Sequence, residues 1–328
     1  MRLLKNSLIT MGACLWAAMG AQALEWSTDP DAAMATATAE QRIVFIEFTG
    51  SGWCPPCMYL QEHIFPTAEF EAYIREKNPV LVELDFPRDT TGISREQWKQ
   101  RENWRVKYKV ENFPRIVVTD GRGYPYAVVK GACPKTEDYL KRIDAALAQK
   151  AQIEHDLAEA RKLSGVERAK ALVKALEVLN DDRETPGWHL MHVDVVDEVI
   201  ANDPDDVTGY RKTREEQQRL TTQLAELVAL GQKYSGRVDK ESQGEAMADA
   251  LAMLERTDLV PVVRLHLYKF VSDSYALRGD AVQTLRYLRA AVNAAPDTHE
   301  ASRLRPWLEN LERNMPESEK QKADEPVK

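Results

Sequence analysis

The chain has 328 residues, which is enough for two domains of ordinary size. It carries 44 basic and 52 acidic side chains, a formal net charge of −8, and no lysine and arginine cluster stands out. This balance argues against a nucleic-acid partner, because nucleic-acid binding depends on concentrated positive charge. The four cysteines are too few for the disulfide framework that staples small exported domains.

The first 23 residues have the pattern of a secretory signal peptide. A basic start precedes an apolar stretch over residues 8–20, and Ala21-Gln22-Ala23 follows as an A-x-A cleavage site. The apolar stretch is shorter than the roughly 20 residues that a membrane span needs. We therefore expect cleavage after Ala23 and an exported, periplasmic protein. Cys14 fits a lipoprotein signal poorly, so lipid anchoring there is not expected.

Residues 24–150 alternate between strand-like and helix-like runs. Strands are expected at 24–26, 43–48, 80–86, 115–119 and 126–130, and helices at 30–41, 54–63, 70–76, 94–108 and 134–147. Asp29-Pro30 and Ser94 are typical helix starts, and residues 120–123 are a hairpin signal between the last two strands. This order predicts an α/β domain with a mixed sheet flanked by helices.

Residues 151–315 show no strand-like runs, and their apolar residues recur at helical spacing, so we expect an all-α domain. Its candidate helices are 151–163, 166–180, 186–201, 204–233, 240–256, 260–278, 280–294 and 299–313. The segment 268–296 resembles one tetratricopeptide repeat, without a second clean copy at that period. The charged tail over residues 316–328 is expected to be disordered.

The most informative motif is Trp53-Cys54-Pro55-Pro56-Cys57, which follows the strand-like run 43–48 and opens a helix-like segment. A strand that delivers Cys-x-x-Cys to the first turn of a helix suits thiol–disulfide exchange. The unpaired N–H groups and the positive dipole end of the helix favour a thiolate at Cys54. Cys57 lies one turn on, close enough to attack a mixed disulfide formed at Cys54.

The two prolines between the cysteines predict a reducing pair. Pro55 and Pro56 have no N–H, so a thiolate at Cys54 keeps mainly the N–H of Cys57 as a donor. Fewer donors stabilise the thiolate less, and the reduction potential is expected nearer about −270 mV than about −120 mV. The alternatives are a fixed disulfide or half of a zinc site. Zinc would need two more ligands, and Cys133 and scattered histidines do not supply them.

Three segments in this order resemble the secreted bacterial thioredoxin-family proteins. They are Phe48-Thr49-Gly50-Ser51-Gly52-Trp53-Cys54-x-x-Cys57, Leu84-Asp85-Phe86-Pro87-Arg88 and Phe113-Pro114. The resemblance covers residues 25–148, somewhat over a third of the chain. It implies a thioredoxin-like fold and a dithiol, Cys54 and Cys57, that shuttles between reduced and oxidised forms without a bound organic cofactor or metal. It makes Cys54 the exposed nucleophile and Cys57 the more buried resolving thiol.

The resemblance also implies the residues that meet a substrate. A cis Phe113–Pro114 bond would place backbone groups beside the cysteines, where an extended substrate can pair; a trans proline at a strand entry is the alternative. Trp53 is expected to shield the motif and offer an aromatic surface, with core packing as the alternative. The expected substrate-binding set is Trp53, Pro55, Pro56, Phe113 and Pro114.

Glu47 lies on the otherwise apolar strand before the motif, so we expect it to be partly buried below the cysteines. The resemblance implies that this acid moves the proton of the resolving thiol, for which a raised pKa is suited. A solvated glutamate is the alternative. Cys133 is expected to be a small buried hydrophobe, with a functional third thiol near the site as the alternative. His189, His192 and Asp194 are expected on a solvated face rather than at a metal.

These observations predict an exported thiol–disulfide oxidoreductase that reduces disulfides through Cys54 and Cys57. Its partners would be protein thiols and disulfides, together with a membrane-linked or soluble electron donor that restores the dithiol. Two alternatives stay open. The helical domain could bind a partner protein while the thioredoxin-like part is a weakly active scaffold, or the pair could serve a disulfide isomerase or oxidase.

Overall fold

The computed structural model describes residues 24–179, 187–234 and 240–325. The predicted signal peptide and Cys14 lie outside these residues. The chain divides into two compact units between Thr208 and Gly209. The first unit contains the cysteine motif, and the second is helical throughout its described part.

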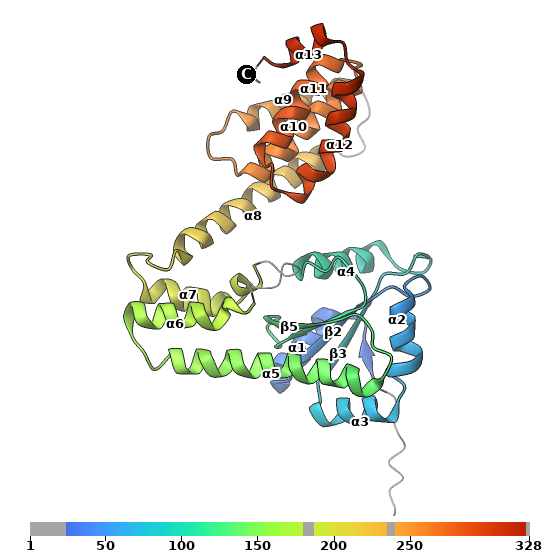
Figure 1. The fold of residues 1–328 in the computed structure, drawn as a ribbon, viewed down its shortest axis with the longest axis vertical. Helices are drawn as coiled ribbons and strands as arrows, with labels where there is room; N and C mark the ends of the chain where they lie inside the picture. Colours follow the sequence, from blue (N-terminus) through green and yellow to red (C-terminus); the bar gives the residue numbers. More distant parts are fainter. Residues whose placement is uncertain (1–23, 180–186, 235–239, 326–328) are drawn as a thin grey trace, which may run out of the picture. The chain divides into compact units, whose positions relative to one another are not determined.

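The first unit is built around a five-stranded mixed sheet with the order β1-β3-β2-β4-β5 (Figure 1). The strands β1 (Trp26–Ser27), β3 and β2 are parallel, and β4 and β5 are antiparallel additions. Their bounds are β2 (Val44–Thr49), β3 (Val80–Asp85), β4 (Arg115–Thr119) and β5 (Pro125–Lys130). β2 is buried along its whole length because helices cover both faces of the sheet. The expected mixed α/β sheet is confirmed.

Two helices before residue 150, α1 (Pro30–Glu40) and α4 (Arg95–Lys107), begin where the predicted caps place them. The Asp29 side chain accepts hydrogen bonds at the start of α1, and Ser94 forms a capping box with Gln97 at α4. The helix expected over 54–63 consists of α2 (Pro55–Tyr59) and a π-helical turn, η1 (Leu60–Ile64). The remaining helices are α3 (Ala68–Lys77) and α5 (Thr136–Ala160).

The two faces of the sheet carry different helices. Alternation along β2 points Phe45 and Glu47 to one face and Phe48 to the other. Phe45 belongs to an apolar cluster with residues of η1, α3 and α5. Phe48 contacts Tyr108 at the end of α4 on the other face. Helix α1 lies on this face too, because Gln100 of α4 donates a hydrogen bond to Asp31 of α1. Figure 1 shows α4 and α5 on opposite sides of the sheet.

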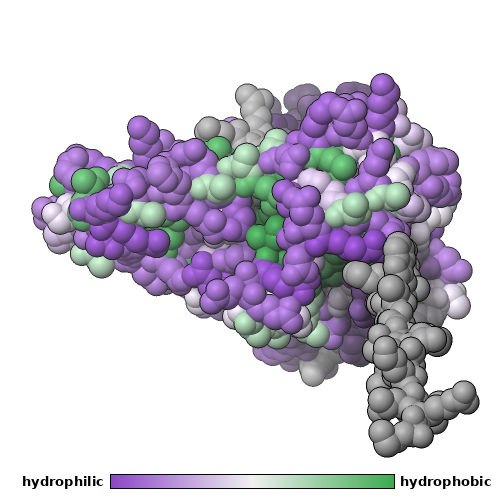
Figure 2. Space-filling view, turned by 90° about the horizontal axis from the view of Figure 1, so that it is seen from below, coloured by the Kyte–Doolittle hydropathy of each residue, from purple (hydrophilic) through white to green (hydrophobic). Residues whose placement is uncertain are grey.

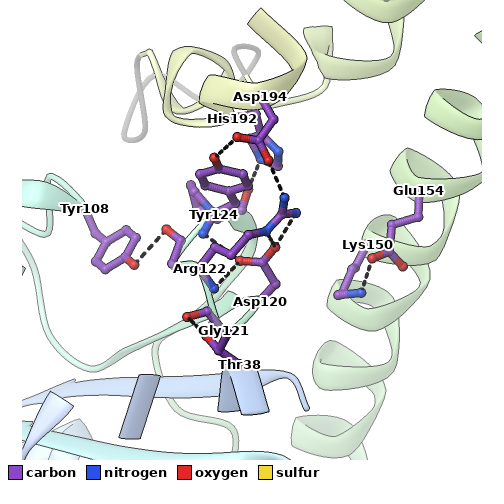
Figure 3. A network of polar contacts seen from close by, with 12 residues as sticks. Thr38, Tyr108, Asp120, Gly121, Arg122, Tyr124, Lys150, Glu154, His192 and Asp194 are labelled. Carbon is purple, nitrogen blue, oxygen red and sulfur yellow. Dashed lines mark hydrogen bonds and ion pairs between the residues drawn. The ribbon is translucent and has the colours of Figure 1, made fainter. Parts of the chain in front are cut away.

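The first unit continues well beyond residue 150. The predicted boundary falls inside α5, and α6 (Gly165–Glu177), the 3-10 turn η2 (Trp188–Met191) and α7 (Val193–Asn202) follow within the same unit. Asp194 accepts hydrogen bonds from Arg122 and Tyr124 of the β4–β5 hairpin region (Figure 3). These contacts attach α7 to the sheet.

His192 differs from the expectation of a solvated face. It is 1% exposed, and its Nε2 lies 2.8 Å from the carbonyl oxygen of Pro125 in β5. Burial lowers the pKa of this imidazole. The expectation was wrong for His192, because the spacing of the histidines cannot show that Tyr124 and Tyr126 of the hairpin region pack against this ring.

The second unit contains α8 (Tyr210–Lys233), α9 (Lys240–Leu254), α10 (Pro261–Ala276), α11 (Ala281–Ala294), α12 (His299–Asn314) and α13 (Glu317–Ala323). Tyr275 of α10 stacks on Tyr287 of α11, inside the segment that resembles a tetratricopeptide repeat. The tail differs from the expected disorder. The structure describes this tail as far as residue 325; Ala323 of α13 is buried, and the Asp324 carboxylate pairs with Arg289 of α11.

The face drawn in Figure 2 is mostly hydrophilic, with hydrophobic residues gathered near its middle. None of the helices in the described ranges is both long and apolar enough to cross a membrane.

Trp188 should anchor the helical part of the first unit to the sheet. Its ring is 2% exposed, meets Tyr108 edge to face, and donates from Nε1 to the Tyr108 carbonyl at 3.3 Å. Trp188→Ala should lower the free energy of unfolding by about 3–5 kcal/mol, because it leaves a cavity and an unpaired carbonyl. Urea unfolding measures this. Val207→Ala, at a side chain 62% exposed, should change the free energy of unfolding by less than about 0.5 kcal/mol. Equal effects of the two substitutions would contradict the anchoring role of Trp188.

Candidate active site

The two cysteines of the motif form a disulfide at the start of α2. Cys54 is the N-cap residue, and its Sγ accepts a hydrogen bond from the Cys57 backbone N–H at 3.3 Å. Pro55 and Pro56 occupy the first helical positions and offer no N–H. The Cys57 N–H is thus the donor that the sequence predicted for Cys54.

Cys54 is more enclosed than expected. It is 4% exposed and Cys57 is 1% exposed, whereas Pro55 and Pro56 are exposed. The turn before α2 explains this position, because the Cys54 N–H bonds to the Gly50 carbonyl at 3.0 Å and holds the residue against the end of β2. Reactants must therefore approach the sulfur over the two prolines and the neighbouring side chains.

The turn is tied to the end of β3 by Asp85. Its carboxylate accepts hydrogen bonds from the Ser51 N–H at 2.8 Å and from the Ser51 hydroxyl at 2.6 Å. The Asp85 carbonyl accepts from Arg101 of α4 at 2.7 Å. These bonds fix the loop that carries Trp53 and Cys54.

An aromatic cluster of Trp53, Phe86, Trp98 and Phe113 lies beside the motif. The Trp53 Nε1–H donates to the Phe86 carbonyl at 2.7 Å, and its ring meets Phe113 edge to face at 5.9 Å. Phe113 stacks on Phe86 at 5.2 Å, and Phe86 contacts Trp98 at 5.7 Å. A side chain at Gly50 would come within 2.7 Å of the Trp53 ring, so this close approach requires glycine.

The Phe113–Pro114 peptide bond is cis. The carbonyl of Pro114 accepts a hydrogen bond from the Gly131 N–H at 3.0 Å, which links the proline to the loop before α5. Phe113 is partly exposed and Pro114 is buried. Pro114 therefore lies beneath the surface beside the cysteines, and the aromatic cluster supplies the accessible part of that surface.

Glu47 is fully buried, which excludes the solvated alternative. Its Oε2 accepts a hydrogen bond from Gln61 at 3.1 Å, and Oε1 has no hydrogen-bond partner among the described residues. Gln61 lies four residues after Cys57, so the carboxyl lies under the helix that carries the cysteines. Burial, followed by the charges of Glu83 and Asp85, raises the pKa of Glu47 well above its ordinary value, against a smaller lowering effect of Gln61.

The third cysteine packs into the apolar core of the first unit. Cys133 is 3% exposed and belongs to the apolar cluster that includes Tyr139, as expected for a small buried hydrophobe. Within the described ranges, no three histidine, cysteine, aspartate or glutamate side chains gather closely enough to hold a metal ion.

Sequence reasoning missed Gln61, Glu83, Phe86 and Trp98 as members of this site. Glu83 is the strongest omission, because it lies directly opposite Glu47 in the parallel pairing of β2 and β3. Phe86 lies in one of the three segments that resemble the thioredoxin family, but no role was expected for it. Trp98 lies in the first turns of the helix that Ser94 caps. The strand pairing and the helix position were needed to connect these residues to the cysteines.

Comparison with known proteins gives one consistent result. Residues 30–147 match the family model of a thioredoxin-like domain. The disulfide bond reductase DsbH of Chlamydia pneumoniae is 27% identical over 124 residues, which are 38% of this chain and 73% of that protein. A solved DsbH oxidoreductase is 24% identical, with a TM-score of 0.35, over 45% of this chain and 94% of that chain. The family match and the mixed sheet confirm the expected thioredoxin-like fold followed by helices.

Glu47 should make the protein less stable as the pH rises. Above the ordinary pKa of 4.5, the unfolded chain releases this proton while the folded protein keeps it. The residue therefore lowers the free energy of unfolding by about 1.4 kcal/mol per pH unit until the raised pKa of the folded state is passed. Glu47→Gln cannot ionise, so its free energy of unfolding should rise relative to that of the wild type over that pH range. Urea unfolding of the oxidised proteins measures the difference.

Glu62→Gln is the matched control, since it removes the same charge from a side chain that is 68% exposed. Its difference from the wild type should stay flat with pH. Parallel pH curves for Glu47→Gln and the wild type would contradict a buried, protonated Glu47.

Proposed function

We propose that this thiol–disulfide oxidoreductase, whose residues 30–147 form a thioredoxin-like domain, reduces the disulfide bonds of exported proteins. The observation that carries the direction is the Cys57 N–H, the one hydrogen bond to Cys54 Sγ found in the described structure. With two prolines in the first turn, a Cys54 thiolate is weakly stabilised, and a weakly stabilised thiolate favours donation of electrons. The Chlamydia pneumoniae relative is named as a disulfide bond reductase, which agrees with this direction.

Each turnover uses both cysteines. The Cys54 thiolate attacks a substrate disulfide, which forms a mixed disulfide and releases one substrate thiolate. Cys57 then loses its proton to the Glu47 carboxylate and attacks Cys54 Sγ, so that the substrate leaves as a dithiol and the Cys54–Cys57 bond forms. A membrane-linked or soluble dithiol donor reduces this bond again. The signal-peptide pattern over residues 1–23 supports a periplasmic location.

The substrate is expected to lie across Pro55 and Pro56 and against Trp53, Phe113 and Pro114. The prolines are exposed, and the aromatic cluster provides partly exposed rings next to the buried sulfurs. Such a surface suits an extended or unfolded protein segment with apolar side chains near its cysteine.

Insulin reduction tests the activity. Cys54→Ser should abolish turnover, because the attacking sulfur is lost, and Cys57→Ala should accumulate mixed disulfides that a gel without reductant resolves. Cys133→Ala should keep most of the activity, since this thiol packs in the apolar cluster. Turnover that survives in Cys54→Ser would contradict the mechanism. Wild-type protein inactive with insulin but active on scrambled ribonuclease would favour an isomerase, and inactivity in both would favour the scaffold alternative.

Phe113 should contribute to substrate binding rather than to the chemical step. Phe113→Ala removes the ring that contacts both Trp53 and Phe86, so the KM for a peptide disulfide should rise about five-fold with kcat nearly unchanged. Steady-state kinetics measures both constants. Val106→Ala, at an exposed side chain of α4, is the control. A fall in kcat with unchanged KM would count against a binding role.

A further inference from the structure

Three carboxyl groups share one face of the sheet beneath the disulfide. Glu47 and Glu83 are directly opposite each other in the β2–β3 pairing, and Asp85 follows two residues later, opposite Thr49. Because side chains alternate along a strand, Glu47, Glu83 and Asp85 all point to the face that carries α2 and η1. Neighbouring strands lie about 4.8 Å apart, so the Glu47 and Glu83 side chains are neighbours.

The surroundings of Glu47 contain little positive charge. Glu83 and Asp85 face it from β3, Gln61 from η1, and Tyr139 of α5 also interacts with it. In the described structure, no cationic side chain forms an ion pair with Glu47. Arg101 of α4 lies near Glu83 and lowers the pKa of that acid, whereas burial and Asp85 raise it. The nearest charges thus favour a neutral Glu47.

Exposure separates the roles of the two glutamates. Glu47 is 0% exposed and its Oε1 has no partner in the described structure, whereas Glu83 is only half-buried. A proton that leaves Glu47 needs a polar neighbour with access to water, and Glu83 is the directly opposite residue on that face. Asp85 is already engaged by the N–H and hydroxyl groups of Ser51.

We propose that Glu83 is a positioning residue for the proton of the resolving thiol: its charge keeps Glu47 protonated in the oxidised protein, and its carboxylate passes protons between Glu47 and water. This role rests on the proposed function, in which Glu47 serves Cys57. In this scheme Glu47 is an acid when the dithiol donor reduces the Cys54–Cys57 bond, which we call recharging, and a base when the protein reduces a substrate.

A dithiol donor restores the reduced protein in two exchange steps. A thiolate of the dithiol donor attacks Cys54 Sγ, the Cys54–Cys57 bond breaks, and the electron pair leaves on Cys57 Sγ. Glu47 gives its proton to that sulfur and becomes the carboxylate that takes the Cys57 proton back in the next reduction, while Glu83 connects this carboxylate to water. The second donor thiolate then attacks the donor sulfur of the mixed disulfide and releases the Cys54 thiolate. The donor is oxidised to a disulfide, and the protein is reduced to a dithiol.

The test compares Glu83→Gln with Glu62→Gln, which removes the same charge from an exposed site. Infrared spectra of the oxidised proteins, with Glu47→Gln used to assign the band, follow protonation of the Glu47 carboxyl as a function of pH. Glu83→Gln should lower the midpoint by about one pH unit, because a like charge is removed, and Glu62→Gln should leave it unchanged. Gln61→Leu should raise the midpoint, because a donor to the carboxylate is lost.

The second readout is the rate at which excess dithiothreitol opens the Cys54–Cys57 bond, divided by the concentration of dithiothreitol thiolate. This rate should fall as Glu47 loses its proton, and Glu83→Gln should shift that fall to lower pH by the same amount as the infrared midpoint. If Glu83→Gln folds poorly by circular dichroism, Glu83→Thr removes the same charge with a residue suited to a strand.

An infrared midpoint that stays in place in Glu83→Gln would overturn the proposal, and so would a moved midpoint with an unmoved rate profile. The infrared titration needs no turnover. Absence of insulin reduction in the wild type together with a moved midpoint would therefore refute the proposed function and still support the coupling of the two acids.

Discussion

Cys54 occupies the N-cap of α2, and the two residues that follow it have no N–H to offer. The Cys57 N–H, 3.3 Å from Cys54 Sγ, is the remaining backbone donor of the first turn. A helix N-terminus normally presents several such groups to an anion, so this constraint limits how far the helix can stabilise a thiolate. In the proposed reductase, the rest of the site is arranged around a Cys54 thiolate that is weakly stabilised and therefore donates electrons readily.

Two walls of different character surround this sulfur. On the outer side, the aromatic cluster and the cis Phe113–Pro114 bond form a partly exposed surface next to a nearly covered disulfide. On the inner side, Glu47 lies under α2 among other carboxyl groups. Asp85 connects the two walls, because it adds to the charge around Glu47 and holds the loop that carries Trp53 through Ser51. In the proposed mechanism, the outer wall selects which disulfides reach Cys54, and the inner wall controls the proton of Cys57.

Much of this site could be predicted because its signals are local in the sequence. The cysteine motif, the donor left by the prolines and the caps at Asp29 and Ser94 depend on residues within one helical turn. Burial of Glu47 followed from its apolar strand neighbours. Glu83 and Trp98 could not be connected to the site, since their positions depend on the pairing of β3 with β2 and on the face where α4 packs.

The errors beyond residue 150 have the same origin. The change from alternating to purely helical pattern is real, but the first unit ends at Thr208 because α6 and α7 pack with it. His192 was expected on a solvated face, but it is buried and its Nε2 lies at hydrogen-bond distance from the Pro125 carbonyl of β5. The tail looked disordered by composition, yet Arg289 of α11 pairs with Asp324 just beyond α13. Contacts between segments far apart in sequence decide each of these cases.

The reduction potential of the Cys54–Cys57 pair tests the central claim most directly. It is measured by equilibrating the mature protein with glutathione buffers of known ratio and trapping the thiols with an alkylating reagent. A weakly stabilised Cys54 thiolate predicts a value near the reducing end, at about −270 mV. A value above roughly −170 mV, in the range of oxidising pairs, would contradict the account.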